Sequence, residues 1–331
     1  MKLRKFAHII LLLTFICWHP SPSSGALKKL GQTGLKFLDV GMGARPAAMG
    51  EAYALLGDDA NAMFYNPAGI VKMRSTVDLT VTHTAWIADI TYNAAALVLN
   101  MEEWGNFGLS AISPDYGTIV GTQIADNNQG YVETGNIDAG AFALGLAYAR
   151  QLTNKFTIGA HFKYASQNLG AVQLEEGGER VENTVSGLAY DLGTMFYPRF
   201  SGWESFGFGM SIKNFSSQFK YAETPFQLPL TFSLGFAGNL LELIGVAPEV
   251  QALNFEVDAL HPRDYTERLH VGAEYSWKNM VSLRSGYKFN YDEEGLSFGI
   301  GLNVYGIGVD YAYSDFGTFN FVNRISVSMA Y

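Results

Sequence analysis

The sequence predicts an all-β protein: a transmembrane antiparallel β-barrel of about 14 strands, with an N-terminal hatch or plug that is partly helical. Bulky apolar residues alternate with small or charged ones along most of the chain, and the alternating segments have the length of a tilted membrane strand. Charged residues make up only 16% of the chain, against about a quarter in soluble domains. The predicted division is a signal peptide at 1–26, a hatch or plug segment at 27–74, and an outer-membrane barrel at 75–331.

The first 26 residues have the composition of a secretory signal peptide. Basic residues lie at positions 2–5, an apolar run covers 9–17, and small residues at 24–26 form a cleavage site. Cys17 is the only cysteine, so the exported chain is expected to have no disulfide and no thiol chemistry.

The last predicted strand shows the alternation most clearly. Its bulky residues are Ile325, Val327, Met329 and Tyr331, and between them lie Arg324, Ser326 and Ser328. Elsewhere the face with small residues also carries charges of both signs, at Lys163, Asp191, Glu256, Arg268, Glu274, Arg284, Lys288 and Asp310. An Arg or Lys facing lipid at mid-membrane costs about 2 to 4 kcal/mol. We therefore expect the bulky face to contact lipid and the charges to pair inside the barrel.

The predicted strands and their connections fit one membrane topology. The strands are expected at 76–85, 91–101, 104–113, 138–150, 154–166, 183–196, 204–213, 228–238, 248–258, 266–277, 279–289, 295–303, 305–314 and 322–331. The connections at 114–137, 167–182 and 214–227 are long, and those between them are short. Outer-membrane barrels place long loops outside and short turns in the periplasm, which assigns the long connections to the external side.

The segment before the barrel has a different composition. Residues 44–56 are rich in Ala, Met and Leu and predict a helix, and Asn66-Pro67-Ala68-Gly69 predicts a turn. A plug inside the lumen would give partners to the interior charges, which are costly when unpaired. A periplasmic arm is the alternative.

Three stretches of this segment resemble the opening of the PorV/PorQ family, within the wider FadL-like group of outer-membrane barrels. They are residues 43–53 (GARPAAMGEAY), 57–62 (GDDANA) and 65–70 (YNPAGI). The resemblance implies that the hatch motif Asn66, Pro67, Ala68 and Gly69 lies in a hatch that fills the lumen. It also implies that the C-terminal residues Ile325, Val327, Met329 and Tyr331 form the signal that the barrel-assembly machinery reads.

The same resemblance implies a bacterial outer-membrane protein without enzymatic activity that acts in type IX secretion. The expected partners are outer-membrane lipid, the barrel-assembly machinery, and translocon or attachment-complex proteins together with the C-terminal domains of their cargo. The alternative is FadL-type transport of hydrophobic small molecules such as long-chain fatty acids. Aromatic residues near the predicted external rim fit either a membrane girdle or a binding surface. They are Trp86, Phe215, Phe219, Tyr221 and Phe226.

Other functional classes find little support in the sequence. With 22 basic against 31 acidic residues the net charge is −9, which argues against binding to nucleic acid. Residues 295–299 match the G-x-S-x-G pattern of hydrolases, but the pattern lies within a predicted strand, where that chemistry does not work. The histidines of the exported chain, His83, His161, His261 and His270, have no metal-ligand spacing. We expect no catalytic residue, no metal and no cofactor.

Overall fold

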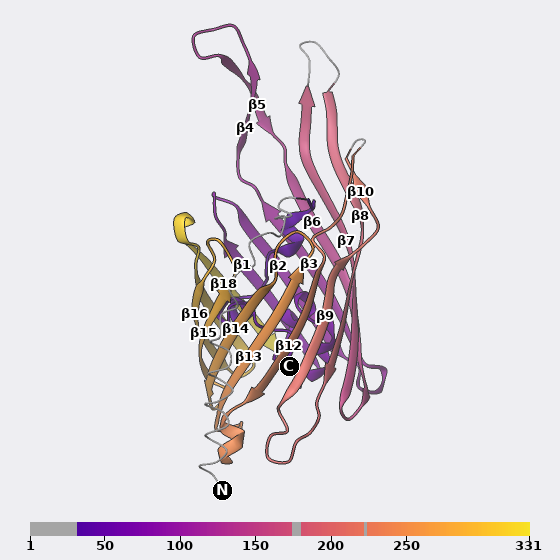
Figure 1. The fold of residues 1–331 in the computed structure, drawn as a ribbon, viewed down its shortest axis with the longest axis vertical. Helices are drawn as coiled ribbons and strands as arrows, with labels where there is room; N and C mark the ends of the chain where they lie inside the picture. Colours follow the sequence, from indigo (N-terminus) through magenta and orange to yellow (C-terminus); the bar gives the residue numbers. More distant parts are fainter. Residues whose placement is uncertain (1–31, 174–179, 222–223) are drawn as a thin grey trace.

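The computed structural model describes residues 32–173, 180–221 and 224–331, which form a closed barrel of 14 antiparallel strands around an N-terminal hatch (Figure 1). The predicted signal peptide lies outside the described residues. The barrel strands are β1 (Val77–Ala85), β2 (Thr91–Asn100), β3 (Asn106–Asp115), β6 (Gly140–Thr153), β7 (Phe156–Gln173), β8 (Arg180–Phe196), β9 (Gly207–Phe215), β12 (Thr231–Asn239), β13 (Gln251–Pro262), β14 (Arg268–Trp277), β15 (Val281–Phe289), β16 (Leu296–Val304), β17 (Ile307–Asp315) and β18 (Phe321–Ala330). β18 pairs with β1 and closes the barrel.

The strand predictions are confirmed to within a few residues, with three corrections on the external side. β7 and β8 keep pairing with each other above the barrel, so most of the loop predicted at 167–182 is strand. The long connection predicted at 114–137 contains a hairpin of β4 (Ile119–Ile124) and β5 (Tyr131–Ile137). A shorter hairpin of β10 (Phe219–Lys220) and β11 (Pro225–Phe226) lies in the connection between β9 and β12. Figure 1 shows β4, β5 and the ends of β7 and β8 projecting beyond the upper rim.

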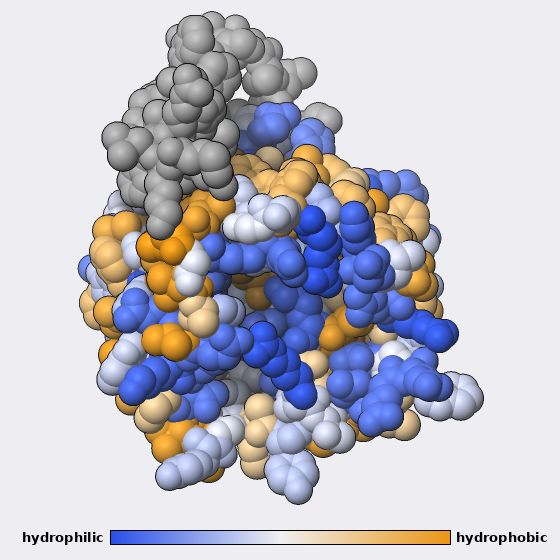
Figure 2. Space-filling view, turned by 90° about the horizontal axis from the view of Figure 1, so that it is seen from below, coloured by the Kyte–Doolittle hydropathy of each residue, from blue (hydrophilic) through white to orange (hydrophobic). Residues whose placement is uncertain are grey.

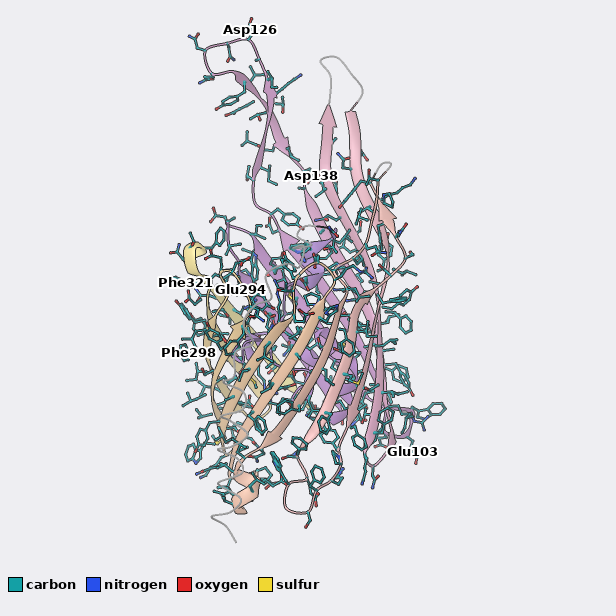
Figure 3. The ribbon with its side chains drawn as sticks, viewed as in Figure 1. Glu103, Asp126, Asp138, Glu294, Phe298 and Phe321 are labelled. Atoms are coloured by element: carbon teal, nitrogen blue, oxygen red, sulfur yellow. The ribbon has the colours of Figure 1, made fainter. Side chains whose placement is uncertain are left out.

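The bulky face of the strands is the outer face, as the sequence predicts. Leu146 on β6 is 61% exposed, whereas its neighbours Gly145 and Ala147 are buried against the lumen. Phe298 and Phe321 lie on the outer surface in Figure 3, with Glu103 at the lower end and Glu294 near the upper rim. Seen from below, hydrophilic residues surround the middle and many hydrophobic residues lie around the circumference (Figure 2). A belt of exposed apolar side chains around a polar interior is the arrangement of an outer-membrane barrel.

The hatch runs through the lumen from the upper rim to the lower rim. Its first described residues pair with the external connections, where Thr33 forms a bridge with Gln227. At the other end the side-chain amide of Asn106, the first residue of β3, donates a hydrogen bond to the carbonyl oxygen of Ile70. The chain then leaves the hatch and enters β1. A plug inside the lumen is therefore the arrangement seen, rather than a periplasmic arm.

The hatch contains only short helices, namely η1 (Lys36–Asp39), α2 (Ala44–Ala48), η2 (Ala60–Phe64) and η3 (Pro67–Lys72). The prediction of a helix over 44–56 is wrong beyond residue 48. Gly50 and Glu51 have positive φ angles of 64° and 60°, which end α2 after five residues. No helix in the described part of the chain is long and apolar enough to cross a membrane.

Candidate functional site

The hatch backbone fits against glycines of the barrel wall. A Cβ on Gly272 would lie 2.5 Å from the carbonyl oxygen of Met49, and a Cβ on Gly286 would collide with the backbone at Met49 and Gly50. Gly159 on β7 receives the backbone at Pro67 and Ala68 in the same way. The small residues that alternate along the strands thus provide the space for the hatch, because only glycine allows this approach.

The hatch motif predicted from the sequence is buried inside the barrel. The Asn66 side chain accepts a hydrogen bond from the Ala68 backbone N–H at 3.1 Å and donates to the carbonyl oxygens of Ala54 and Thr194, at 2.6 and 3.1 Å. It therefore caps η3 and joins two hatch segments to β8. Pro67, Ala68 and Gly69 are buried beside it. The C-terminal residues Ile325, Val327, Met329 and Tyr331 are exposed on the outside of β18 and the end of the chain; their role in barrel assembly stays a prediction.

A first ion-pair network joins the hatch to β14, β15 and β17. The Arg45 guanidinium contacts Glu274 through two nitrogens, and Arg45 Nη1 also contacts Asp58 at 2.5 Å. Glu274 in turn accepts a hydrogen bond from Arg284 Nε at 2.7 Å, and Arg284 Nη1 lies 2.6 Å from Asp310. The mixed charges of the interior pair with one another, as the sequence predicts.

A second network surrounds Glu51, which follows α2. Its carboxylate lies 3.1 Å from Lys288 Nζ and 3.4 Å from Arg324 Nη2. Lys288 also contacts Glu294 of the external connection at 2.5 Å. Burial would raise the pKa of Glu51, but the charges of Lys288 and Arg324 outweigh burial and hold that pKa at about 2.

Two acidic side chains of β13 bind consecutive backbone amides of the hatch. Asp258 Oδ2 accepts from the N–H groups of Tyr53 and Ala54 at 2.9 and 3.1 Å. Glu256 accepts from the N–H groups of Leu55 and Leu56, at 2.5 and 2.9 Å. These four amides belong to a turn with no regular hydrogen-bonding ladder, so the carboxylates satisfy buried donors that would otherwise be orphaned.

A cavity of about 190 Å³ lies in the upper half of the lumen, between the hatch and the wall formed by β9 and β12 to β15. Its walls combine aromatic rings with charged groups of both signs. Lys213 and Arg268 line it together with the rings of Tyr65, Trp86, Tyr265 and Tyr291. Sequence reasoning placed Arg268 on the interior face but did not find the cavity, because its walls come from five strands and three hatch segments.

Several aromatics predicted near the external rim face inward rather than toward lipid. Trp86, Phe219, Tyr221 and Phe226 pack into an apolar cluster at the upper end of the lumen, together with hatch residues such as Phe37. Phe215 is 55% exposed and is the one of the five that faces outward. The interpretation as a membrane girdle is therefore wrong for the other four, whose position depends on the hatch segment that covers them.

A buried polar network on the wall next to β9 contains a serine, a histidine and an aspartate from β3, β7 and β8. Ser110 Oγ lies 2.8 Å from His161 Nε2, and His161 Nδ1 lies 3.3 Å from Asp191 Oδ2. The serine, histidine and aspartate thus follow one another in the spatial order of a hydrolase triad. However, Asp191 is also paired with Lys163 at 2.7 Å, and none of the three lines the cavity described above.

The same network has a structural role that its geometry accounts for. Asp191 accepts from the Asn214 backbone N–H at 2.7 Å, Lys163 Nζ donates to the Asn214 side chain at 2.6 Å, and Asn214 Nδ2 donates to the carbonyl oxygen of Leu38 at 3.4 Å. It therefore joins β7, β8 and β9 to the hatch. Within the described ranges, no group of three or more His, Cys, Asp or Glu residues is placed to hold a metal ion.

Known structures with a similar fold are outer-membrane channels. The monoaromatic hydrocarbon channel CymD aligns with a TM-score of 0.55 and 15% identity, covering 88% of this chain and 98% of CymD. The Pseudomonas putida toluene transporter TodX gives 0.55 and 15%, covering 87% and 96%. A Pseudomonas aeruginosa FadL homologue gives 0.50 and 14%, covering 86% and 96%. The fold is thus that of the FadL-like barrels, and the chain is a bacterial outer-membrane β-barrel.

The sequence comparisons place the chain in a family. No curated protein matches the sequence. A family model described as an uncharacterised protein family matches residues 19–196, which is more than half of the chain and includes the hatch and the strands up to β8. The chain belongs to this family, UPF0164.

Proposed function

We propose that this barrel carries a small organic molecule across the outer membrane, with the hatch controlling passage. The observation that carries the proposal is the cavity of about 190 Å³ between the hatch and the wall near the external mouth. Clefts and cavities that combine aromatic walls with a few converging polar groups are the usual form of small-molecule sites. The similarity to a toluene transporter and to a monoaromatic hydrocarbon channel supports this choice of function.

The hatch has the contacts of a plug that is held in place by the wall. Below the cavity its backbone lies against wall glycines, and the Arg45 and Glu51 networks fix it laterally. A solute that enters the cavity therefore reaches a closed lumen, so transport requires a shift of the hatch or of the wall beside it.

Uptake by whole cells tests the proposal. The gene is expressed in a Gram-negative host whose own channels of this type are deleted, and uptake of radiolabelled toluene, benzoate and oleate is measured. Uptake of at least one solute above the vector control is expected. Ser233, which lines the cavity and is 5% exposed, is changed to Trp to fill it. Ser233→Trp should abolish the added uptake, whereas Thr153→Trp, at the lower end of β6, should keep it.

Docking of exported proteins, as in type IX secretion by PorV/PorQ-like barrels, is the second candidate. The projecting strands favour it, because all residues of β5 except Ile137 are exposed and the tip of the hairpin at Asp126 is far from the barrel (Figure 3). The hairpin and its flanks carry Asp126, Glu133 and Asp138 but no basic residue. None of the similar structures named above is a secretion component by its description.

Purification of the native complex from outer membranes in mild detergent distinguishes the two candidates. Docking would be established by two results together. Secretion proteins, or exported proteins that share a C-terminal domain, co-elute with the intact barrel, and they no longer co-elute after residues 118–138 are deleted. A barrel that elutes alone and promotes solute uptake would establish transport.

A further inference from the structure

Two cations that line the luminal cavity form no ion pair with any acidic residue in the described part of the chain. Neither Arg268 nor Lys213 forms an ion pair or a side-chain hydrogen bond with any residue that the structure describes, and the buried Nε of Arg268 has no hydrogen-bond partner there. Both side chains are half-buried. An unpaired cation in a confined space is costly, because its hydration is reduced without compensation.

The acidic residues of the same cavity are already engaged. Glu51 and Glu294 are bound to Lys288, and Asp39 is bound to Lys36. Asp258 accepts the two hatch N–H groups through Oδ2, and its other oxygen lies against Gly235. The lining holds four Lys or Arg and four Asp or Glu side chains, but each of these carboxylates is bound to a group other than Arg268 or Lys213.

The surroundings hold the Arg268 guanidinium in one orientation. Its central carbon lies 4.0 Å from the ring centroid of Tyr265 and 3.9 Å from that of Tyr291, so the guanidinium forms cation–π contacts with both rings. The Tyr291 hydroxyl is hydrogen-bonded to His270 Nε2 at 2.7 Å, which fixes one of these rings. The cation–π contacts leave the N–H donors of the guanidinium for a ligand, and a guanidinium binds carboxylates in a two-point contact.

Lys213 faces the same cavity from β9, and its Nζ lies 5.4 Å from the ring centroid of Tyr65. Trp86 adds a further aromatic surface from the connection between β1 and β2. The cavity thus offers two cationic groups from one part of the wall together with aromatic rings, which suits a flat molecule with an acidic group.

We propose that the cavity binds a compact organic anion of the aromatic carboxylate class, with the carboxylate on Arg268 and Lys213 and the ring against the neighbouring aromatic residues. This inference rests on the proposed transport function and specifies its substrate class. It differs from a site for a neutral hydrocarbon, which would leave both cations without a partner.

Calorimetric titration of the purified full-length mature barrel tests it, with benzoate as the probe and benzamide as its neutral counterpart of nearly equal shape. Benzoate should bind at least about tenfold more tightly than benzamide, because a charge-assisted contact is lost in the amide. Arg268→Gln and Lys213→Gln should each weaken benzoate binding by about tenfold and leave benzamide binding unchanged. Arg268→Lys should keep part of the affinity, because it keeps the charge.

Arg199→Gln is the matched control, since Arg199 lies in the connection between β8 and β9 at the opposite end and is largely exposed. It should bind benzoate as the native protein does. Heat-modifiable migration on gels shows whether each variant is folded, and Lys213→Gln carries the test if Arg268→Gln does not fold.

Equal binding of benzoate and benzamide, or native benzoate affinity in both glutamine variants, would overturn the inference. In either case the cavity would still bind a ring, and the transport proposal would stand. Binding of neither compound also overturns the inference, and the uptake of toluene and oleate then decides separately whether the barrel is a transporter.

Discussion

Arg45 of the hatch and Glu274 of β14 form a two-point ion pair, with Arg45 Nε 2.9 Å from Oε2 and Nη2 3.0 Å from Oε1. Both side chains are largely buried, and their exposed fractions are 16% and 4%. The planar guanidinium matches the carboxylate in one orientation only. The pair therefore fixes where α2 lies along the wall, in addition to holding it there.

Removing this ion pair should loosen the hatch. Arg45→Ala leaves the buried Glu274 with Arg284 as its remaining cation, and breaking a buried pair typically costs about 3 to 5 kcal/mol. We expect faster proteolysis of the hatch and a higher conductance in planar bilayers, with normal heat-modifiability of the barrel. Arg199→Ala is the control. Protection of the hatch equal to that of the native protein would show that the glycine contacts alone hold it.

Glycines of the wall should tolerate substitution only where the hatch does not approach. Gly286→Val places two methyl groups against the backbone at Met49 and Gly50, and overpacking of this kind costs about 1 to 3 kcal/mol or displaces the hatch. Gly140→Val is the matched control, because a Cβ at Gly140 would meet no atom within 4 Å. Hydrogen exchange of hatch amides checks the difference. Equal protection in both variants contradicts the fit described here.

The stability of the hatch should fall in acid because of Glu51. Its pKa is held at about 2 in the folded protein against an ordinary value of 4.5. Because the pKa is lowered in the folded protein, ionised Glu51 contributes to the free energy of unfolding. This contribution is fully present above about pH 4.5 and is lost as the pH falls toward 2. The difference corresponds to about 3 kcal/mol.

Urea unfolding of the detergent-solubilised protein between pH 6 and pH 2 measures this effect. The native protein should lose about 3 kcal/mol more of its unfolding free energy over this range than Glu51→Gln does. Glu102→Gln, an exposed residue at the lower rim, should lose as much as the native protein. Parallel pH profiles for the native protein and Glu51→Gln would refute the assignment.

The depth of a charged side chain in the membrane should decide how much it destabilises the folded barrel when it faces lipid. Leu146 and Leu152 point outward from the same strand and are 61% and 53% exposed. Leu146 lies near the middle of the barrel wall and Leu152 at its lower end. Leu146→Arg should destabilise the folded barrel by about 2 to 4 kcal/mol and Leu152→Arg by about 1 kcal/mol or less. Unfolding in lipid vesicles measures both, and equal costs would place the membrane elsewhere on the barrel.

Much of the architecture follows from the sequence because the period of two is a local property of each strand. A residue such as Leu146 faces lipid, and Gly145 beside it faces the lumen, whichever strand lies next to them. The strand lengths, the presence of charges of both signs in the interior and the location of the long connections on the external side can be predicted in the same way. The hatch segment is identified by its different amino-acid composition and by the Asn66-Pro67 turn. The side chain of Asn66 caps a helix formed by the residues that follow it directly in the sequence.

The helix over 44–56 and the aromatic girdle are the predictions that fail, and both fail for a tertiary reason. The helix ends early because the chain turns at Gly50 to fit between the wall glycines. Trp86 and Phe219 face inward because the hatch offers them an apolar surface at the upper rim. Neither partner is near in sequence.

The sequence by itself determined that this chain forms an outer-membrane barrel preceded by a segment of different composition, because strand period, strand length and composition are properties of short segments. Only the tertiary structure decided that this segment plugs the lumen. It also decided which charges pair and which remain free. Arg268 belongs to the same set of interior charges as Arg284, yet Arg284 meets Glu274 and Asp310 while Arg268 meets two tyrosine rings and a cavity. That distinction depends on the closure of the barrel around the hatch, which brings distant strands and loops to a single site.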